Sequence, residues 1–187
     1  MVICEFSQYT LLLYYFATVL LKSYLCTMDY IIRSLAEADN TAIAQVIRSV
    51  FIELGAPTTG TAYADPVLDT LSYVYDKKGS AYFVVESAGS IIGGAGIAPL
   101  YGGMPGVCEL QKMYFLGKAR GKGIGAHLIQ KCLNAAIQFG YSKCYLETLD
   151  TMQAAQKLYT KTGFGYLDAP LGNTGHNSCQ VWMLKDL

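Results

Sequence analysis

The sequence predicts one α/β domain in which helices cover both faces of a mixed β-sheet. Segments with the apolar spacing of a helix alternate along the chain with short β-rich segments, in the order βααβββαβαββ. The chain has 187 residues, of which 52% are hydrophobic, and this is enough for one domain with a sizeable core.

The first predicted elements are a strand and a long helix. Residues 30–34 are β-rich, and the segment after them has apolar residues at helical spacing, namely Ile43, Val46, Ile47, Val50, Phe51 and Leu54. Asp39 is the candidate N-cap of this helix, because its carboxylate can accept a hydrogen bond from an N–H of the first turn. Gly55 can end the helix.

A second helix and a β-hairpin are predicted next. The helix begins at Asp65-Pro66, because proline is tolerated in the first turn, where no N–H is needed. Two β-rich runs, 81–86 and 90–98, are joined at Ala88-Gly89, which is a hairpin signal. Glycines inside the second run indicate a bulge or a close backbone approach. They are Gly93, Gly94 and Gly96.

The second half of the chain continues the alternation. Helices are predicted at 124–139 and 153–162, ended by Gly140 and Gly163. Strands are predicted at 107–116, 143–148, 166–167 and 178–184.

A glycine-rich turn precedes the helix at 124–139. Residues 120–126 (RGKGIGA) would place several backbone N–H groups at a helix N-terminus, where the helix dipole adds positive potential. The turn therefore suits a phosphate or pyrophosphate. It is no Walker A loop, because Gly123 follows Lys122. A dinucleotide fingerprint matches the glycine spacing, but 116–120 separate the turn from the preceding strand and too little chain follows.

Three segments, which follow one another along the chain at 109–115, 120–126 and 155–164, resemble the GNAT superfamily of N-acetyltransferases. Residues 120–126 are similar to its acetyl-CoA loop, Arg/Gln-x-x-Gly-x-Gly/Ala, and 109–115 (ELQKMYF) look like its fourth strand. Residues 155–164 match its A-x-x-L-Y-x-K-x-G-F element. The resemblance covers about Met28 to Leu187. It implies a GNAT (acyl-CoA N-acyltransferase) fold, whose fourth and fifth strands splay apart and admit the pantetheine arm.

The resemblance implies an enzyme that transfers an acetyl group from acetyl-CoA to a primary amine. Direct attack in a ternary complex is expected, because the sequence offers no nucleophile constellation for a covalent acyl-enzyme. The transfer needs a base for the amine, donors for the oxyanion and an acid for the leaving thiolate. A transferase that uses a longer acyl-CoA, a non-catalytic CoA-binding module and a nicotinamide-binding protein stay open as alternatives.

Two residues are the catalytic candidates that the resemblance implies. Tyr159 occupies the position of the family's acid, and its hydroxyl has a reference pKa of about 10. Packing between helix and sheet is the alternative role. Glu109 is the candidate base, as on the fourth strand of the histone-acetylating branch, although it could face solvent or orient an ammonium. Glu147 is a weaker rival, and His176 lies in a loop that often borders the acceptor pocket.

The resemblance also implies the residues that bind the acetyl donor. Met113 and Phe115 would pair through backbone N–H and C=O groups with the pantetheine amides. The pyrophosphate cradle would be formed by Arg120, Gly121, Lys122, Gly123, Gly125 and Ala126. Met152 stands where many members have a cofactor-contacting asparagine, so it is expected to pack instead.

Residues 1–27 are predicted to lie outside the N-acetyltransferase domain at 28–187. The apolar run 9–21 is shorter than the span of about 20 residues that a membrane helix needs. It also lacks the basic residues and cleavage site of a signal peptide. We hypothesise that Met28 is the functional start. A helix packed on the domain and a membrane anchor stay open as alternatives.

Composition bounds the partners and the setting. The 14 basic and 14 acidic side chains balance, which gives no electrostatic case for nucleic acid. The six cysteines show no zinc spacing, so no metal is expected, and most lie in apolar patterns typical of reduced core residues. We therefore expect a cytoplasmic protein that acts on a small-molecule or peptide amine. Membrane binding is not expected, and a homodimer stays open.

Overall fold

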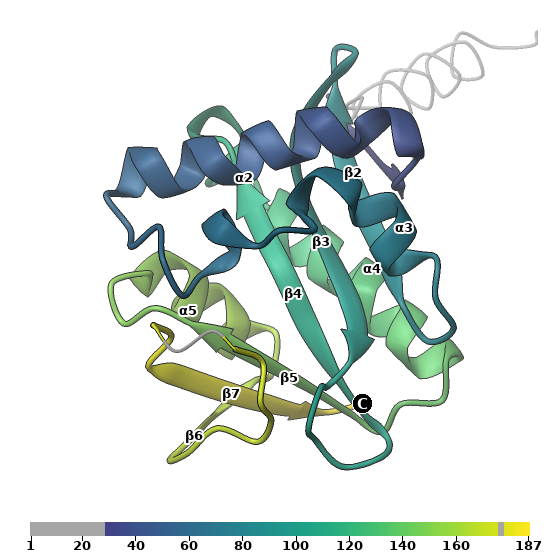
Figure 1. Cartoon of the computed structure of the whole chain (residues 1–187), viewed down its shortest axis with the longest axis vertical. Helices are drawn as coiled ribbons and strands as arrows, with labels where there is room; N and C mark the ends of the chain where they lie inside the picture. The colour runs from purple at the N-terminus through teal and green to yellow at the C-terminus, as the bar shows by residue number, and fades with distance from the viewer. Residues whose placement is uncertain (1–28, 176–177) are drawn as a thin grey trace, which may run out of the picture.

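The computed structural model describes residues 29–175 and 178–187, which form a seven-stranded mixed sheet (Figure 1). The strand order is β1-β2-β3-β4-β5-β7-β6, and every neighbouring pair is antiparallel except β4 and β5. The strands are β1 (Ile31–Ser34), β2 (Ala81–Ser87), β3 (Ser90–Pro99), β4 (Val107–Phe115), β5 (Lys143–Thr148), β6 (Gly165–Leu167) and β7 (Val181–Asp186). The extension predicted at 1–27 and His176 lie outside the described residues.

Helices cover both faces of the sheet, as the sequence predicts. Helices α2 (Asn40–Leu54) and α3 (Leu71–Tyr75) lie in front of it in Figure 1, and α4 (Ile124–Gln138) lies behind. One core cluster joins α2 and α3 to Tyr82 and Val84 of β2. A second cluster joins α4 and α5 (Gln153–Lys161) to the opposite face. Among the described residues, no helix is long and apolar enough to cross a membrane.

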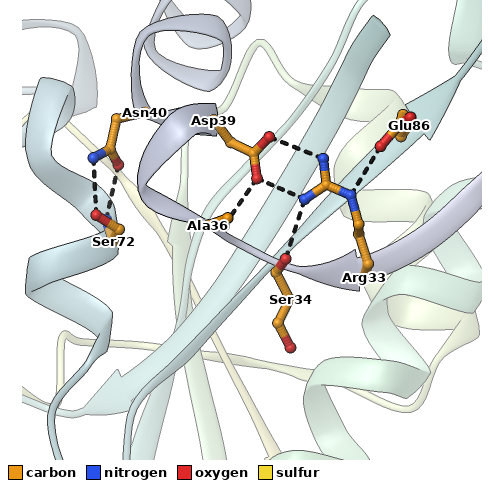
Figure 2. A network of polar contacts seen from close by, with 7 residues as sticks. All are labelled: Arg33, Ser34, Ala36, Asp39, Asn40, Ser72 and Glu86. Atoms are coloured by element: carbon orange, nitrogen blue, oxygen red, sulfur yellow. Dashed lines mark hydrogen bonds and ion pairs between the residues drawn. The ribbon is translucent and has the colours of Figure 1, made fainter. Parts of the chain in front are cut away.

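The predicted capping role of Asp39 is wrong. Its backbone is helical (φ −86°, ψ −14°), and its carboxylate does not bond the first turn of α2. It accepts two hydrogen bonds from the Arg33 guanidinium, at 2.6 and 2.9 Å, and one from the Ala36 N–H at 2.9 Å (Figure 2). Arg33 also donates to Glu86 of β2 at 2.8 Å. The charged partner on β1 takes the carboxylate away from the helix end.

The second predicted helix is interrupted. A 3₁₀ turn at Leu68–Thr70 precedes α3, because Thr70 leaves the helical region (φ −134°, ψ 32°). Asn40 at the start of α2 exchanges two hydrogen bonds with Ser72, at 2.8 and 2.9 Å, and so ties α3 to α2 (Figure 2). The hairpin turn is confirmed, with Ala88 and Gly89 both at positive φ.

The glycines of β3 make close approaches, and β4 carries a bulge opposite them. A Cβ at Gly93 would lie 2.3 Å from Phe115, and one at Gly96 would lie 2.5 Å from Tyr82. Lys112 is the bulged residue of β4, with φ 50°, and the register shifts there against β3. The side chains of Glu109 and Gln111, before the bulge, therefore face the α3 side of the sheet.

Strands β4 and β5 pair over a short length and then part. The ladder joins only Val107–Glu109 to residues 143–145, and Figure 1 shows the two strands diverging from that end. The splayed strands implied by the resemblance are therefore present. The gap exposes one edge of β4 beyond Glu109.

Candidate active site

A cavity of about 560 Å³ lies where β4 and β5 part. The end of β4, the glycine-rich turn and α5 line it, with Met113, Phe115, Arg120, Gly123, Leu158 and Tyr159 among the lining residues. Gly121, Gly125 and Ala126 line it as well. Of the predicted donor-binding residues, only Lys122 does not line the cavity. Glu109 also lies outside its lining.

The glycine-rich turn has the geometry of an anion site. Gly121 and Gly123 are both left-handed, with φ of 75° and 78°, and a Cβ at either would meet nothing within 4 Å. The Arg120 amide bonds the Gly117 carbonyl, and the next such backbone bonds along the turn are those of the Ala126 and His127 amides, both to the Gly123 carbonyl. The N–H groups ahead of them begin the helix and have no intrahelical acceptor. They suit a diphosphate placed at the start of α4.

Arg120 is anchored rather than free. Its two terminal nitrogens donate to the carboxylate of Glu53 on α2, at 2.8 and 2.9 Å, and its Nε donates to the Phe115 carbonyl at 2.9 Å. The guanidinium therefore ties the turn to α2 and to the end of β4. Lys122 is exposed beside it. Glu53 could not be predicted from the sequence, because it lies on an exposed part of α2 and is 67 residues from Arg120 in the chain.

Met113 and Phe115 contribute side chains to the core, as either interpretation expects. Both pack against the cluster that α4 and α5 form with the sheet. A Cβ at Gly125 would lie 2.7 Å from Leu158 and 3.5 Å from Met113, so this glycine lets α4 begin close to α5. The backbone of β4 here has no β5 partner and can pair with an extended ligand.

Glu109 lies on β4 and is only 3% exposed to solvent. Its Oε2 accepts a hydrogen bond from Gln111 Nε2 at 2.6 Å. Burial raises the pKa of Glu109 to about 7, and the Glu147 carboxylate adds to the rise, while Gln111 and Lys112 oppose it. A carboxyl with this pKa can exchange a proton near neutral pH.

Glu147 on β5 shares the face of the sheet with Glu109. Tyr145 pairs directly with Glu109, and Glu147 follows two residues later, so the side chains point the same way. Tyr145 donates its hydroxyl to Glu147 Oε1 at 2.7 Å, and Thr174 donates to Oε2 at 2.8 Å. Glu147 is therefore held in place by neutral donors.

Tyr159 lies on α5 and lines the cavity. It is 7% exposed, and its ring meets Phe164 edge to face at 6.1 Å. Burial raises the pKa of its hydroxyl, so the group stays protonated at neutral pH. In the described part of the chain this hydroxyl makes no hydrogen bond, which leaves it able to donate to a ligand. Met152 lines the same cavity.

Cys179, which was not predicted from the sequence, lies within electrostatic range of both carboxylates and of Tyr159. Burial raises the pKa of its thiol to about 12, and the negative charges of Glu147 and Glu109 add to the rise. The same thiol raises the pKa of Tyr159. Glu109, Glu147 and Tyr159 are therefore all within electrostatic range of one thiol, although of the three only Tyr159 lines the cavity.

Known proteins resemble this chain in sequence and in fold. Residues 49–164 match the acetyltransferase (GNAT) family. The chain is 47% identical to the uncharacterized N-acetyltransferase YjgM of Escherichia coli K12 over 158 residues, 84% of this chain and 95% of that protein. An acetyltransferase of the GNAT family from Staphylococcus aureus Mu50 aligns with a TM-score of 0.75 and 20% identity, over 84% of this chain and 99% of that chain. A GNAT superfamily phosphinothricin acetyltransferase from Sinorhizobium meliloti, in complex with AcCoA, aligns with a TM-score of 0.69 and 19% identity, over 86% and 89%.

Proposed function

Because the chain belongs to the acetyltransferase (GNAT) family and is an acyltransferase, we propose that it transfers acetyl from acetyl-CoA to a primary amine by direct attack in a ternary complex. The family uses acetyl-CoA as donor. The observation that carries the proposal is the cavity of about 560 Å³, which joins an anion-binding turn to the Tyr159 hydroxyl between parted strands.

The turn and the open edge of β4 bind the donor. The N–H groups of Gly121, Gly123 and Gly125 hold the diphosphate, and Arg120 fixes the turn through Glu53. The backbone of Met113 and Phe115 pairs with the pantetheine amides as an added strand would. The same edge offers an N–H to the thioester oxygen, where negative charge develops. The donor itself supplies the electrophilic carbonyl.

Glu109 takes the proton from the attacking amine. A typical amine is cationic at neutral pH and cannot attack until it loses a proton. Burial brings the pKa of Glu109 to about 7, where a carboxylate is both partly ionised and basic enough to accept that proton. Glu147, on the same face, supports the ammonium before transfer.

Tyr159 protonates the leaving thiolate. Tyr159 lines the donor cavity, and its hydroxyl stays protonated because burial raises its pKa. Phenylalanine at this position would keep the packing on Phe164 and remove only the donor.

The first experiment is a thermal shift with acetyl-CoA, CoA and NAD in parallel, followed by thiol release with a panel of amines. A ligand at about 100 times its Kd stabilises a protein by about 2.7 kcal/mol. Stabilisation by CoA species, with thiol release that falls at least tenfold in Tyr159→Phe, supports the proposal. Tyr166→Phe is the matched control, because Tyr166 is 59% exposed on β6. Binding without turnover would favour the CoA-binding module, and a shift with NAD alone would overturn the proposal.

The catalytic domain is proposed to span 28–187. The described sheet begins at Ile31 and ends at Asp186, and the family match lies within these limits. A cytoplasmic setting is proposed as well, and it is supported by buried free thiols at Cys108, Cys132 and Cys144.

A further inference from the structure

A chain of hydrogen bonds links α3 to the candidate base. The Tyr75 hydroxyl donates to Gln111 Oε1 at 2.8 Å, and Gln111 Nε2 donates to Glu109 Oε2 at 2.6 Å. Tyr75 is the last residue of α3 and is 6% exposed. Gln111 lies on β4, two residues after Glu109 and just before the bulge.

We propose that Tyr75 and Gln111 are positioning residues for Glu109. Tyr75 fixes the orientation of the Gln111 amide, and the amide stabilises the ionised form of Glu109 through one carboxylate oxygen, which leaves the second oxygen for the acceptor. The inference rests on the proposed role of Glu109 as the base.

The donor and acceptor roles along this series of hydrogen bonds follow from the chemistry of Tyr75 and Glu109 at its two ends. Burial raises the pKa of Tyr75 well above its ordinary value, so its hydroxyl keeps its proton and donates. The hydroxyl donates to the amide oxygen of Gln111, which leaves the NH₂ group facing Glu109. When Glu109 is ionised, the opposite orientation would set an amide oxygen 2.6 Å from a carboxylate oxygen. The orientation that Tyr75 selects therefore favours the ionised form of Glu109.

Gly96 makes room for this arrangement. It pairs directly with Gln111 across β3 and β4. A Cβ at Gly96 would lie 2.7 Å from Tyr75 Cε1 and 2.5 Å from Tyr82 Cδ2. The two tyrosine rings meet at 5.0 Å over this glycine, and only one of them reaches Gln111. The Tyr82 hydroxyl donates instead to the Lys112 carbonyl, at 2.9 Å.

The other groups around Glu109 leave the amide as the main support of its charge. Burial and Glu147 of β5 oppose ionisation, while Gln111 favours it more strongly than Lys112 does. The ammonium of Lys112 also pairs with Asp65 at 2.7 Å. Tyr145 of β5 and Cys179 are neutral, because burial raises the pKa of each.

The second oxygen of the carboxylate is left for substrate. Among the described residues, Glu109 Oε1 has no hydrogen-bond partner, whereas no fully buried side-chain oxygen there lacks one. Oε1 is therefore not fully shielded from solvent, although the residue as a whole is only 3% exposed.

The test is a direct titration of Glu109 by carbon NMR. The full chain would be labelled at the glutamate carboxyl carbon and saturated with CoA, and the signal would be assigned by its loss in Glu109→Gln. Gln111→Met keeps the shape and removes both amide bonds. It is expected to raise the midpoint by about one pH unit. Tyr75→Phe is expected to raise it by about half as much, and Tyr82→Phe, the matched control, is expected to leave it unchanged.

An unshifted midpoint in Gln111→Met would overturn the inference, and so would a Tyr75→Phe midpoint equal to that of Tyr82→Phe. If Gln111→Met does not fold, Gln111→Asn, which withdraws the amide from reach, takes its place. The rate of thiol release by Glu109→Gln, with an amine from the panel, distinguishes failure of the base role of Glu109 from failure of this inference alone. A wild-type rate would overturn the base role together with this inference. An inactive Glu109→Gln with unshifted titrations would overturn this inference alone.

Discussion

Arg120 and Glu53 form a two-pronged ion pair, with nitrogen to oxygen distances of 2.8 and 2.9 Å, that fastens the glycine-rich turn to α2. Arg120 also donates to the Phe115 carbonyl at the end of β4. A single side chain thus joins the turn, α2 and the end of β4, each of which contributes to the lining of the donor cavity. The guanidinium shapes the turn, and the diphosphate is left to the backbone N–H groups.

This arrangement predicts that Glu53→Gln and Arg120→Ala both weaken acetyl-CoA binding. Each partner is about one third to one half exposed, so the pair is worth about 1 kcal/mol or less, and each change should raise Kd by about fivefold at most. Calorimetric titration would measure it. Arg48→Ala is the matched control, because Arg48 forms an equivalent pair with Asp69 from the same helix, away from the turn. Tighter binding by Glu53→Gln would instead mean that the released guanidinium contacts phosphate.

Gly123→Ala tests the turn itself. Gly123 has φ 78°, so alanine there costs about 1 kcal/mol in strain, and its Cβ would point into the open space that the diphosphate would fill. We expect acetyl-CoA affinity to fall by at least about tenfold. Gly140→Ala at the other end of α4 is the control, with φ 85° and no atom within 4 Å of a Cβ. It should lose the same stability and keep its affinity. Equal affinities in the two variants would argue against a phosphate site.

Features set by neighbouring residues were predictable from the sequence. The ends of α2 and α4, the hairpin turn and the glycine-rich turn all depend on glycine within a few positions, and the structure has each of them. The placement of Tyr159 beside the cavity was predicted from a motif of consecutive residues, 155–164, that begins in α5 and ends just after it. A local pattern is sufficient here, because the physics that fixes it is local.

Pairs of residues that only the fold brings together could not be predicted from the sequence. Asp39 carries the pattern of an N-cap, and only the pairing of β1 with β2 shows that Arg33 takes its carboxylate. Gln111 gave no signal, because its role depends on α3 ending above Gly96. Glu53 likewise meets Arg120 only when α2 crosses the end of β4. Side-chain hydrogen bonds between elements that are distant in the chain leave no periodic pattern in the sequence, so they cannot be predicted from it.

The pH dependence of turnover should report Glu109. Because its pKa is about 7 and the ionised form is the base, kcat/KM should fall as pH drops below about 7, by about tenfold per pH unit. Steady-state rates with an amine from the panel would show this acidic limb, corrected for ionisation of the amine. Glu109→Gln should lose the limb along with most of the activity. A limb that survives in Glu109→Gln belongs to another group.

The same buried carboxyl should make stability fall as pH rises. Its pKa is raised in the folded state from 4.5 to about 7, so the folded protein holds the proton more tightly than the unfolded chain. The stabilisation that the tighter proton binding by Glu109 contributes is fully present below about pH 4.5, and it is lost as the pH rises to about 7. Glu109→Gln should therefore gain in Tm over wild type by about 5 °C between these pH values. A constant difference in Tm would mean that Glu109 titrates normally.

The charge of the acceptor side predicts which amines are preferred. Glu109 and Glu147 share one face of the sheet, and Lys112, which favours ionisation of Glu109, pairs with Asp65. A second positive charge on the acceptor should therefore help, and a carboxylate should hinder. Among acceptors of equal length, we expect kcat/KM to rise from γ-aminobutyrate through butylamine to putrescine. Glu147→Gln should cut the advantage of putrescine over butylamine by several-fold, because it removes one of the two carboxylates. The amide keeps the size of the side chain and can accept from only one of the two hydroxyls that now donate to Glu147, those of Tyr145 and Thr174. A preference for γ-aminobutyrate would contradict this assignment of Glu147, since its carboxylate would have to approach two like charges.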